Sequence, residues 1–199
     1  MSPFLICTLT DYLRTLEKQF SLTGNTDKYS QEQQLLLSTD YWDKKLGGVF
    51  DYHYLSHLLQ NIYQDQIILY LTIHDKQQFK IEGVLIYGMI GLNPRLEWWL
   101  NIWELKLVAK TADSEISGVG VALIRWLEKR RFIKRLILID HSDYPGYYKH
   151  LGYQLLNPDG VVSSRRWKRR LRWLKISKKN IEGEHIYYKN KKRVKNEQT

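Results

Sequence analysis

The sequence is poor in cysteine and contains no long apolar run, and both shortages narrow the class of protein. Cys7 is the one cysteine among 199 residues, which excludes an internal disulfide framework and a zinc site built from several cysteines. We therefore predict no metal site. No stretch approaches the roughly 18 apolar residues of a membrane-spanning helix, and the N-terminus lacks the basic and apolar regions of a signal peptide. We expect a soluble, intracellular, cytoplasmic protein.

The composition is that of a folded domain. Hydrophobic residues make up 43% of the chain, and the seven Trp and fourteen Tyr argue against disorder. A chain of 199 residues favours one domain with a sizeable core. No internal repeat is present, and the basic segment near the C-terminus is the only segment of biased composition.

The net charge of +10 is concentrated near the C-terminus. Residues 163–199 hold 14 of the 31 Lys and Arg residues but only 3 of the 21 acidic residues, whereas residues 1–162 are nearly neutral. A localised basic segment favours a polyanionic partner more than an evenly charged surface does.

Hydrophobic periodicity predicts a mixture of helices and strands, that is, an α/β (α+β) protein. Ser21–Ser30 is rich in Gly, Asn, Thr and Asp and is predicted to be a loop. The first helix is predicted to be capped by Thr10 or Asp11. The expected helices are 10–20, 31–38, 50–63 and 121–129, and the expected strands are 3–9, 67–74, 80–90, 102–109, 135–140 and 183–188.

A strand, a glycine-containing turn and a helix follow one another in the middle of the chain. The strand 102–109 and the polar break 110–114 lead into Glu115-Ile116-Ser117-Gly118-Val119-Gly120, and a helical pattern follows. The first amides of a helix have no partner within it, and the helix dipole favours negative charge there. Glycines allow close approach of a phosphate to the backbone. This stretch therefore favours an anion site, although an ordinary acidic loop before a helix is an alternative.

The stretch that follows carries a second motif, Pro145-Gly146-Tyr147-Tyr148-Lys149-His150-Leu151-Gly152-Tyr153. Together the two motifs resemble those of the GNAT superfamily of acyl-CoA-dependent N-acetyltransferases. That family has a Q/R-x-x-G-x-G/A turn, a helix, a strand and then F/Y-Y/F-x-x-x-G-F/Y. The resemblance covers residues 103–156 well and the rest loosely, and it is closest to the histone-type lysine acetyltransferases.

The resemblance implies a GNAT-like fold over residues 1–190, with a mixed, mostly antiparallel sheet flanked by helices in a single domain. Residues 191–199 are expected to be a disordered basic tail. The implied co-substrate is acetyl-CoA, whose acetyl group passes to a primary amine by direct attack. A protein lysine or N-terminus, a small amine and an RNA amine all remain open as acceptors.

The resemblance also assigns cofactor-binding positions. Pantetheine is expected along the strand, and the pyrophosphate on the backbone amides of the turn; the residues are Val108, Ala109, Lys110, Glu115, Ile116, Ser117, Gly118, Val119, Gly120 and Val121. Glu115 stands where the family usually has Gln or Arg, and Ser117 where Arg or Lys is common. Both changes remove positive charge beside the phosphates. They keep open an alternative: a catalytically weak or inactive GNAT-fold protein that binds nucleic acid through its basic C-terminal segment.

Two residues are candidates for catalysis. Tyr148 occupies the aromatic position at which many members of the family have a tyrosine near the CoA sulfur, and a phenol can protonate a departing thiolate. Glu104 interrupts an apolar strand eleven residues before Glu115, the spacing of the general base in histone-type members. The alternatives are a core aromatic for Tyr148 and an exposed strand residue for Glu104. His53, His57 and His141 are weaker candidates for the base.

The basic segment 163–179 is predicted to lie before the last strand. Nine of its residues are Lys or Arg, and Trp167, Leu171 and Leu174 have helical spacing. Basic residues neutralise phosphates and Trp stacks on unpaired bases, which favours RNA or another polyanion as a partner; DNA, an anionic membrane surface and simple packing of the helix on the domain stay open as alternatives. The residues assigned to this contact are Arg165, Arg166, Trp167, Lys168, Arg169, Arg170 and Arg172. The oligomeric state is not predicted.

Overall fold

A computed structural model describes residues 4–60, 66–74, 78–89, 101–140, 146–155, 165, 169 and 185–190. The chain divides into two compact units. The first unit comprises Met1–Tyr87 and Leu107–Trp126, and the second comprises Gly88–Lys106 and Leu127–Thr199. Strand β4 and helix α6 each pass from one unit into the other.

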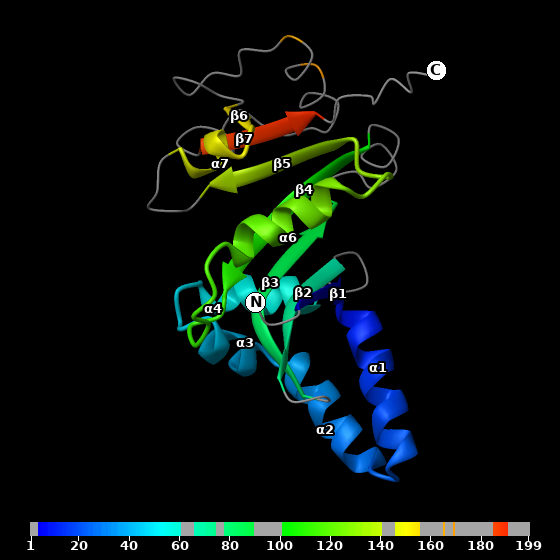
Figure 1. Cartoon of the computed structure of the whole chain (residues 1–199). Coiled ribbons are helices and arrows are strands. Elements are labelled where there is room, and N and C mark those ends of the chain that lie inside the picture. Colours follow the sequence, from blue (N-terminus) through cyan, green and yellow to red (C-terminus); the bar gives the residue numbers. More distant parts are fainter. Residues whose placement is uncertain are drawn as a thin grey trace, which may run out of the picture. The chain divides into compact units, whose positions relative to one another are not determined.

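In its described residues, the first unit contains four N-terminal helices and the first strands of the sheet (Figure 1). Its elements are β1 (Phe4–Thr8), α1 (Leu9–Leu22), α2 (Thr26–Leu36), α3 (Thr39–Lys45), α4 (Tyr52–Gln60), β2 (Gln66–His74), β3 (Gln78–Gly88), the end of β4 (Ile102–Lys110) and most of α6 (Val119–Glu128). The second unit contains the start of β4 and the end of α6, followed by β5 (Arg135–Asp140), α7 (Tyr147–His150), β6 (Gln154–Leu155) and β7 (His185–Asn190).

The strands form a mixed, mostly antiparallel sheet. Among the described residues it has seven strands in the order β1-β2-β3-β4-β5-β7-β6. The pairs β1/β2, β2/β3, β5/β7 and β6/β7 are antiparallel. The β4/β5 pair is parallel, and its register runs from Ile102 opposite Arg135 to Leu105 opposite Leu138. The mixed sheet and its helices confirm the predicted fold class.

The core of the first unit lies between the N-terminal helices and one face of β2 and β3. Alternate residues of β2, namely Ile67, Leu69 and Leu71, point to this face, as the period of a strand requires. Trp42 of α3 is 1% exposed, and its indole N–H donates to the backbone carbonyl of Leu36 at 2.8 Å. A buried indole needs such an acceptor, so this bond also joins α3 to the end of α2.

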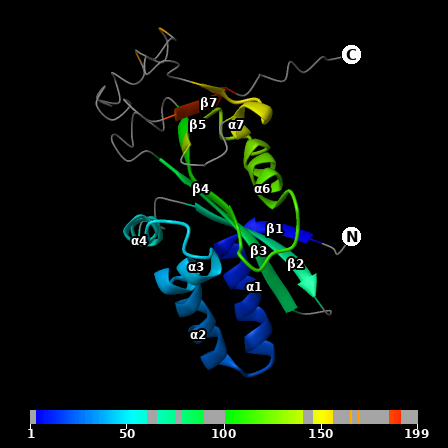
Figure 2. The same ribbon diagram turned by 90° about the vertical axis from the view of Figure 1, so that its left-hand side faces the viewer.

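Helix α6 packs on the other face of β3, next to the end of β4 (Figure 2). Gly83 of β3 pairs with Tyr70, whose neighbour Leu71 points to the helical core, and therefore Gly83 faces α6. A Cβ atom at Gly83 would lie 2.3 Å from Cγ1 of Val119 and 2.9 Å from the carbonyl oxygen of Ala109. The absence of a side chain at Gly83 thus allows α6 to approach the sheet closely.

The second unit is built around β5. Its consecutive residues Leu136, Ile137 and Leu138 are all buried. A strand buried on both faces reads as a continuous apolar run, which is how the sequence predicts it. Ile186 and Tyr187 of β7 are also buried, and the register places them opposite Ile139 and Leu138.

The prediction is wrong at several boundaries in the N-terminal half. The cap of α1 is Thr8, and not Thr10 or Asp11: its hydroxyl accepts the N–H of Asp11 at 3.0 Å. Helix α2 begins at Thr26, inside the predicted loop, because its helical turns pack on α1. The short helix α3, absent from the prediction, depends on the burial of Trp42. In the middle of the chain α6 begins at Val119, two residues earlier than predicted.

Within the part of the chain that the structure describes, none of the helices combines the length and the apolar character that crossing a membrane requires. No group of three or more His, Cys, Asp or Glu side chains in the same described ranges is placed to hold a metal ion.

The close approach at Gly83 gives a stability prediction. Gly83→Ala is expected to lower the free energy of unfolding by about 1–3 kcal/mol, because the new methyl group overpacks the contact between β3 and α6. Urea unfolding followed by circular dichroism measures the change. Adding Val119→Ala to Gly83→Ala removes the shorter of the two clashes, so the double variant is expected to lose less than the sum of the single losses. Strict additivity would contradict the contact.

Candidate functional site

The turn that leads into α6 is exposed. Glu115, Ser117 and Gly118 all lie at the surface, and Ile116 is half-buried. The first helical bond of α6 runs from the N–H of Ala122 to the carbonyl of Gly118 at 2.9 Å. The N–H groups of the preceding first turn therefore have no acceptor within the helix, and such groups are the ones that bind an anion at a helix N-terminus.

Gly118 owes its place to its backbone conformation. Its φ angle is +76°, in the left-handed region that L side chains rarely adopt, and a Cβ atom there would meet nothing within 4 Å. A side chain would therefore fit in the space, but a residue with a side chain would adopt this backbone conformation only at a cost in free energy. The predicted glycine turn thus has a local physical reason.

The residues just before the turn are attached to β3. The N–H of Thr111 donates to the carbonyl of Glu82 at 2.9 Å, and its hydroxyl donates to the carbonyl of Ile81 at 3.3 Å. Thr111 is completely buried. Ser114 is also buried, and its hydroxyl oxygen accepts the N–H of Ile116 at 3.3 Å. These bonds fix the backbone as it enters the turn.

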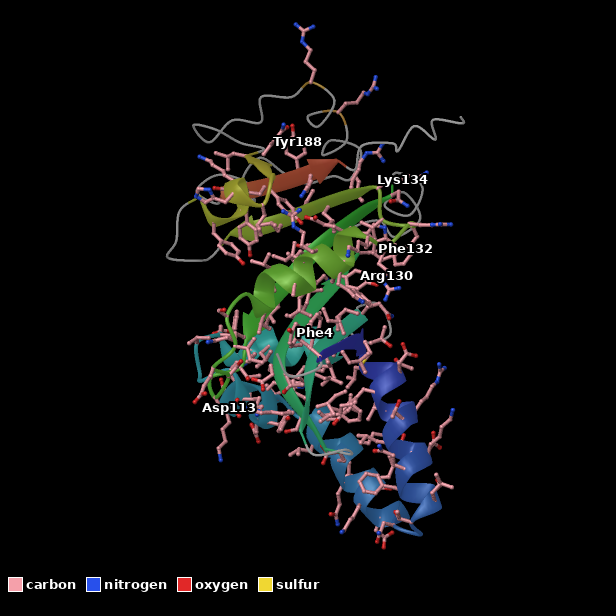
Figure 3. The ribbon with its side chains drawn as sticks, viewed as in Figure 1. Phe4, Asp113, Arg130, Phe132, Lys134 and Tyr188 are labelled. Atoms are coloured by element: carbon pink, nitrogen blue, oxygen red, sulfur yellow. The ribbon has the colours of Figure 1, made fainter. Side chains whose placement is uncertain are left out.

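Two lysines hold Asp113 from different elements. The ammonium group of Lys45, at the end of α3, lies 2.8 Å from Oδ2 of Asp113, and that of Lys80 donates to the backbone carbonyl of Asp113 at 2.9 Å. The carbonyl of Lys45 also accepts the N–H of Ala112 at 2.9 Å. The hydrogen bond from Lys45 is the main cause of the lowered pKa of Asp113, which is labelled in Figure 3. The segment is thus held by both β3 and α3.

Glu82 is a buried carboxylate beneath this segment, and the sequence analysis did not select it. Only 3% of its surface is exposed. Thr72 donates its hydroxyl to Oε1 at 2.9 Å, and the ammonium group of Lys80 lies 3.5 Å from the same atom. Burial by itself raises the pKa of Glu82, but hydrogen bonds from Ser114 and Thr72 and the charge of Lys80 outweigh it, so the pKa is lowered.

A β-bulge places Glu82 there. Ile81 pairs with Leu71 and Gly83 with Tyr70, so Glu82 is the extra residue on β3. The sequence carries one signal that could have revealed it: Glu82 is the one charged residue between Ile81 and Gly88. A similar signal led to the selection of Glu104, but the bulge that turns Glu82 toward Thr72 leaves no mark in the sequence pattern.

Tyr148, in the second unit, is packed among aromatic rings. It is 9% exposed, and its ring centroid lies 5.1 Å from that of Tyr147, 5.9 Å from that of Tyr153 and 5.8 Å from that of Tyr187. Tyr147 is half-buried, and burial raises its pKa. Tyr148 is therefore held in one orientation by its neighbours. That packing also fits the alternative of a core aromatic, so its role stays a prediction.

The turn after α7 is held by Lys189 of β7. Its ammonium group donates to the carbonyl of Leu151 at 2.6 Å and to Oε1 of Glu128 at 2.9 Å, and it lies 5.1 Å from the centroid of the Tyr153 ring. Gly152 adopts a φ of +85°, which permits the tight return of the chain. The contacts of Lys189 and the positive φ of Gly152 thus stabilise the conformation of the second motif.

The other predicted site residues lie as follows. Glu104 is half-buried on β4, opposite Ile137 in the parallel register. Val108 and Ala109 are half-buried at the end of β4, and Lys110 is exposed. Arg165 and Arg169 are helical and exposed. Arg166, Trp167, Lys168, Arg170 and Arg172 lie outside the described residues, as does the tail 191–199.

Comparison with known proteins identifies the fold. No protein-family model matches the sequence, and no curated protein matches it. The crystal structure of Tetrahymena GCN5 is similar over 80% of this chain and 87% of its own, with a TM-score of 0.53 and 15% identity. The PaiA N-acetyltransferase from Thermoplasma acidophilum, in complex with coenzyme A, is similar over 95% of this chain and 99% of its own, with a TM-score of 0.46 and 13% identity.

A GNAT-family acetyltransferase from Bacillus cereus is similar over 97% of this chain and 99% of its own, with a TM-score of 0.48 and 13% identity. The similarity to Tetrahymena GCN5, together with the mixed sheet described above, shows that this chain has the GNAT fold. The fold agrees with the one that the two sequence motifs predict. Identities this low define the fold and leave the reaction to be argued from the residues.

The lowered pKa of Glu82 gives a pH prediction. Because the folded pKa lies below the ordinary value of 4.5, the carboxylate stabilises the folded state above that pH, and the contribution is lost as the pH falls through the folded pKa. Glu82→Gln is expected to lower the free energy of unfolding at pH 7 by about 1–3 kcal/mol. The difference between wild type and variant is expected to shrink on acidification.

Urea unfolding at a series of pH values between neutrality and pH 3 measures this difference. Glu17→Gln, on the exposed surface of α1, is the matched control and is expected to leave the curve close to that of the wild type. A difference between wild type and Glu82→Gln that stays constant across the pH range would contradict the account of Glu82.

Proposed function

We propose that the protein is an acetyl-CoA-dependent N-acetyltransferase. The observation that carries the proposal is the exposed turn 115–118, which enters α6 through a left-handed Gly118 in a chain with the GNAT fold. The amides of Val119, Gly120 and Val121 would bind the pyrophosphate of the cofactor, and the fixed entry segment 111–114 would hold them in place.

Glu115 and Ser117, the two departures from the family motif, weaken this proposal less than the sequence alone suggests. Glu115 and Ser117 are both exposed. An exposed carboxylate in high-dielectric solvent repels a nearby phosphate only weakly. The backbone amides, which need no particular side chain, would supply the binding. This supports the enzyme over the alternative of a catalytically inactive protein.

The chemical step would follow from the resemblance. A neutral primary amine attacks the thioester carbonyl, Glu104 accepts the proton of the amine and Tyr148 gives a proton to the CoA thiolate. The half-buried position of Glu104 and the fixed ring of Tyr148 are compatible with these roles. The acceptor remains open among a protein lysine or N-terminus, a small amine and an RNA amine.

Calorimetric titration with acetyl-CoA tests the cofactor proposal. Micromolar binding is expected for the wild type, and Gly118→Ala is expected to weaken it about fivefold to thirtyfold, because a left-handed alanine costs about 1–2 kcal/mol. Gly24→Ala is the matched control, since Gly24 has a φ of +71° and equally open surroundings in the turn between α1 and α2. An equal effect of both variants, or no binding at millimolar ligand, would contradict the proposal.

The catalytic roles predict a separation of binding from chemistry. Tyr148→Phe and Glu104→Gln are each expected to lower kcat about a hundredfold or more while the acetyl-CoA affinity stays near that of the wild type. Release of CoA thiol in the presence of lysine peptides, polyamines or RNA measures the rate. Tyr147→Phe, in the adjacent position, is the control and is expected to keep most of the activity. Equal losses for Tyr147→Phe and Tyr148→Phe would indicate a packing role for both.

A further inference from the structure

The connection between α6 and β5 is strongly basic. Residues 129–134 (Lys-Arg-Arg-Phe-Ile-Lys) contain four cationic side chains and no acidic one, and β5 then begins with Arg135. Lys129, Arg131, Phe132 and Lys134 are exposed. This segment, which we call the α6–β5 loop, lies far in the sequence from the basic segment 163–179 and takes no part in the site described above.

The α6–β5 loop is held in a defined conformation. Ile133 is completely buried and anchors it to the second unit. The side chain of Asn101 donates to the carbonyl of Phe132 and accepts the N–H of Lys134, both at 2.5 Å. Asn101 itself has a φ of +50°, a left-handed conformation that asparagine tolerates better than most residues. The charged side chains are therefore displayed by a fixed backbone.

Phe132 is an exposed aromatic ring among these charges. It is 48% exposed, and it meets Trp103 edge to face at a centroid distance of 5.5 Å. Figure 3 labels it together with its neighbours Arg130 and Lys134, at the junction of α6 and β5. Contact with Trp103 fixes the ring but leaves about half of its surface open to a further flat partner.

The negative charge nearest to this loop in the sequence is already paired. The one acidic residue next to it in the sequence, Glu128, pairs with Lys189 at 2.9 Å. Among the described residues, no carboxylate forms an ion pair with Lys129, Arg131 or Lys134. Like charges crowded on one loop repel one another, and a bound polyanion would relieve that repulsion.

We propose that the α6–β5 loop binds single-stranded nucleic acid, with Lys129, Arg131 and Lys134 on the phosphates and one unpaired base stacked on Phe132. The exposed ring distinguishes this partner from a duplex, whose bases are already stacked and out of reach. It also distinguishes it from an anionic membrane. A membrane-binding element needs a broad apolar face, and Phe132 is the one exposed large hydrophobic residue in this loop.

Fluorescence anisotropy with a short labelled single-stranded RNA, at several salt concentrations, tests the proposal on the full chain. The triple variant Lys129→Gln, Arg131→Gln and Lys134→Gln is expected to bind about tenfold more weakly. The slope of log K against log salt is expected to fall in magnitude by about 2, since each phosphate contact on a single strand contributes about 0.7. The matched control is Arg14→Gln, Lys18→Gln and Lys28→Gln, which removes the same charges from exposed positions of α1 and α2.

Variants at Phe132 separate the contribution of base stacking from that of charge. Phe132→Ala is expected to weaken RNA binding about fivefold or more with an unchanged salt slope, and Phe132→Tyr, which keeps the ring, is expected to bind like the wild type. Circular dichroism melting of each variant checks that it is folded.

Several results would overturn the proposal. They are equal binding by the two triple variants, no effect of Phe132→Ala, or competition by duplex RNA as strong as that by a single strand. A loop variant that loses binding to phosphatidylserine vesicles but keeps RNA binding would assign the loop to a membrane surface instead. None of these outcomes depends on acetyl-CoA binding, which is measured separately.

Discussion

The candidate cofactor turn depends on the attachment of residues 111–114 to β3, and Glu82 is at the centre of that attachment. A carboxylate that is 3% exposed is tolerated only where hydrogen bonds and an opposite charge compensate its burial. Thr72 and Lys80 provide that compensation at Oε1, and Lys80 also donates to the carbonyl of Asp113. The same lysine thus joins the buried charge to the backbone that enters the turn. Glu115, Ser117 and Gly118 of the turn are exposed, so the turn relies on this attachment for its conformation.

The sequence predicts the parts of the fold whose patterns are local. The buried strand β5 is a continuous apolar run, and β2 is rich in β-branched and aromatic residues, so both are found where expected. The GNAT fold is predicted from the two motifs, and each motif contains a turn that needs glycine. Gly118 and Gly152 both adopt a left-handed backbone conformation, which other residues rarely do. These glycines therefore mark the positions of the two turns in the sequence.

Features that arise from long-range packing are not predictable in this way. Helix α2 begins in a segment whose Gly, Asn and Asp content is typical of a loop, and packing on α1 overrides that preference. Glu82 reaches Thr72 only because a bulge shifts the register of β3. In the α6–β5 loop the clamp by Asn101 joins residues about thirty positions apart, and no pattern of spacing reveals it.

The central claim is that acetyl-CoA binds to the backbone of the turn before α6, and amide hydrogen exchange with and without the cofactor tests it most directly. The account predicts that saturating acetyl-CoA slows exchange at residues 115–121, where the exposed amides would become hydrogen-bonded to phosphate oxygens. The amides of α1 and α2 are expected to exchange at unchanged rates. Unchanged exchange at 115–121 while calorimetry shows binding would place the cofactor elsewhere and contradict the account.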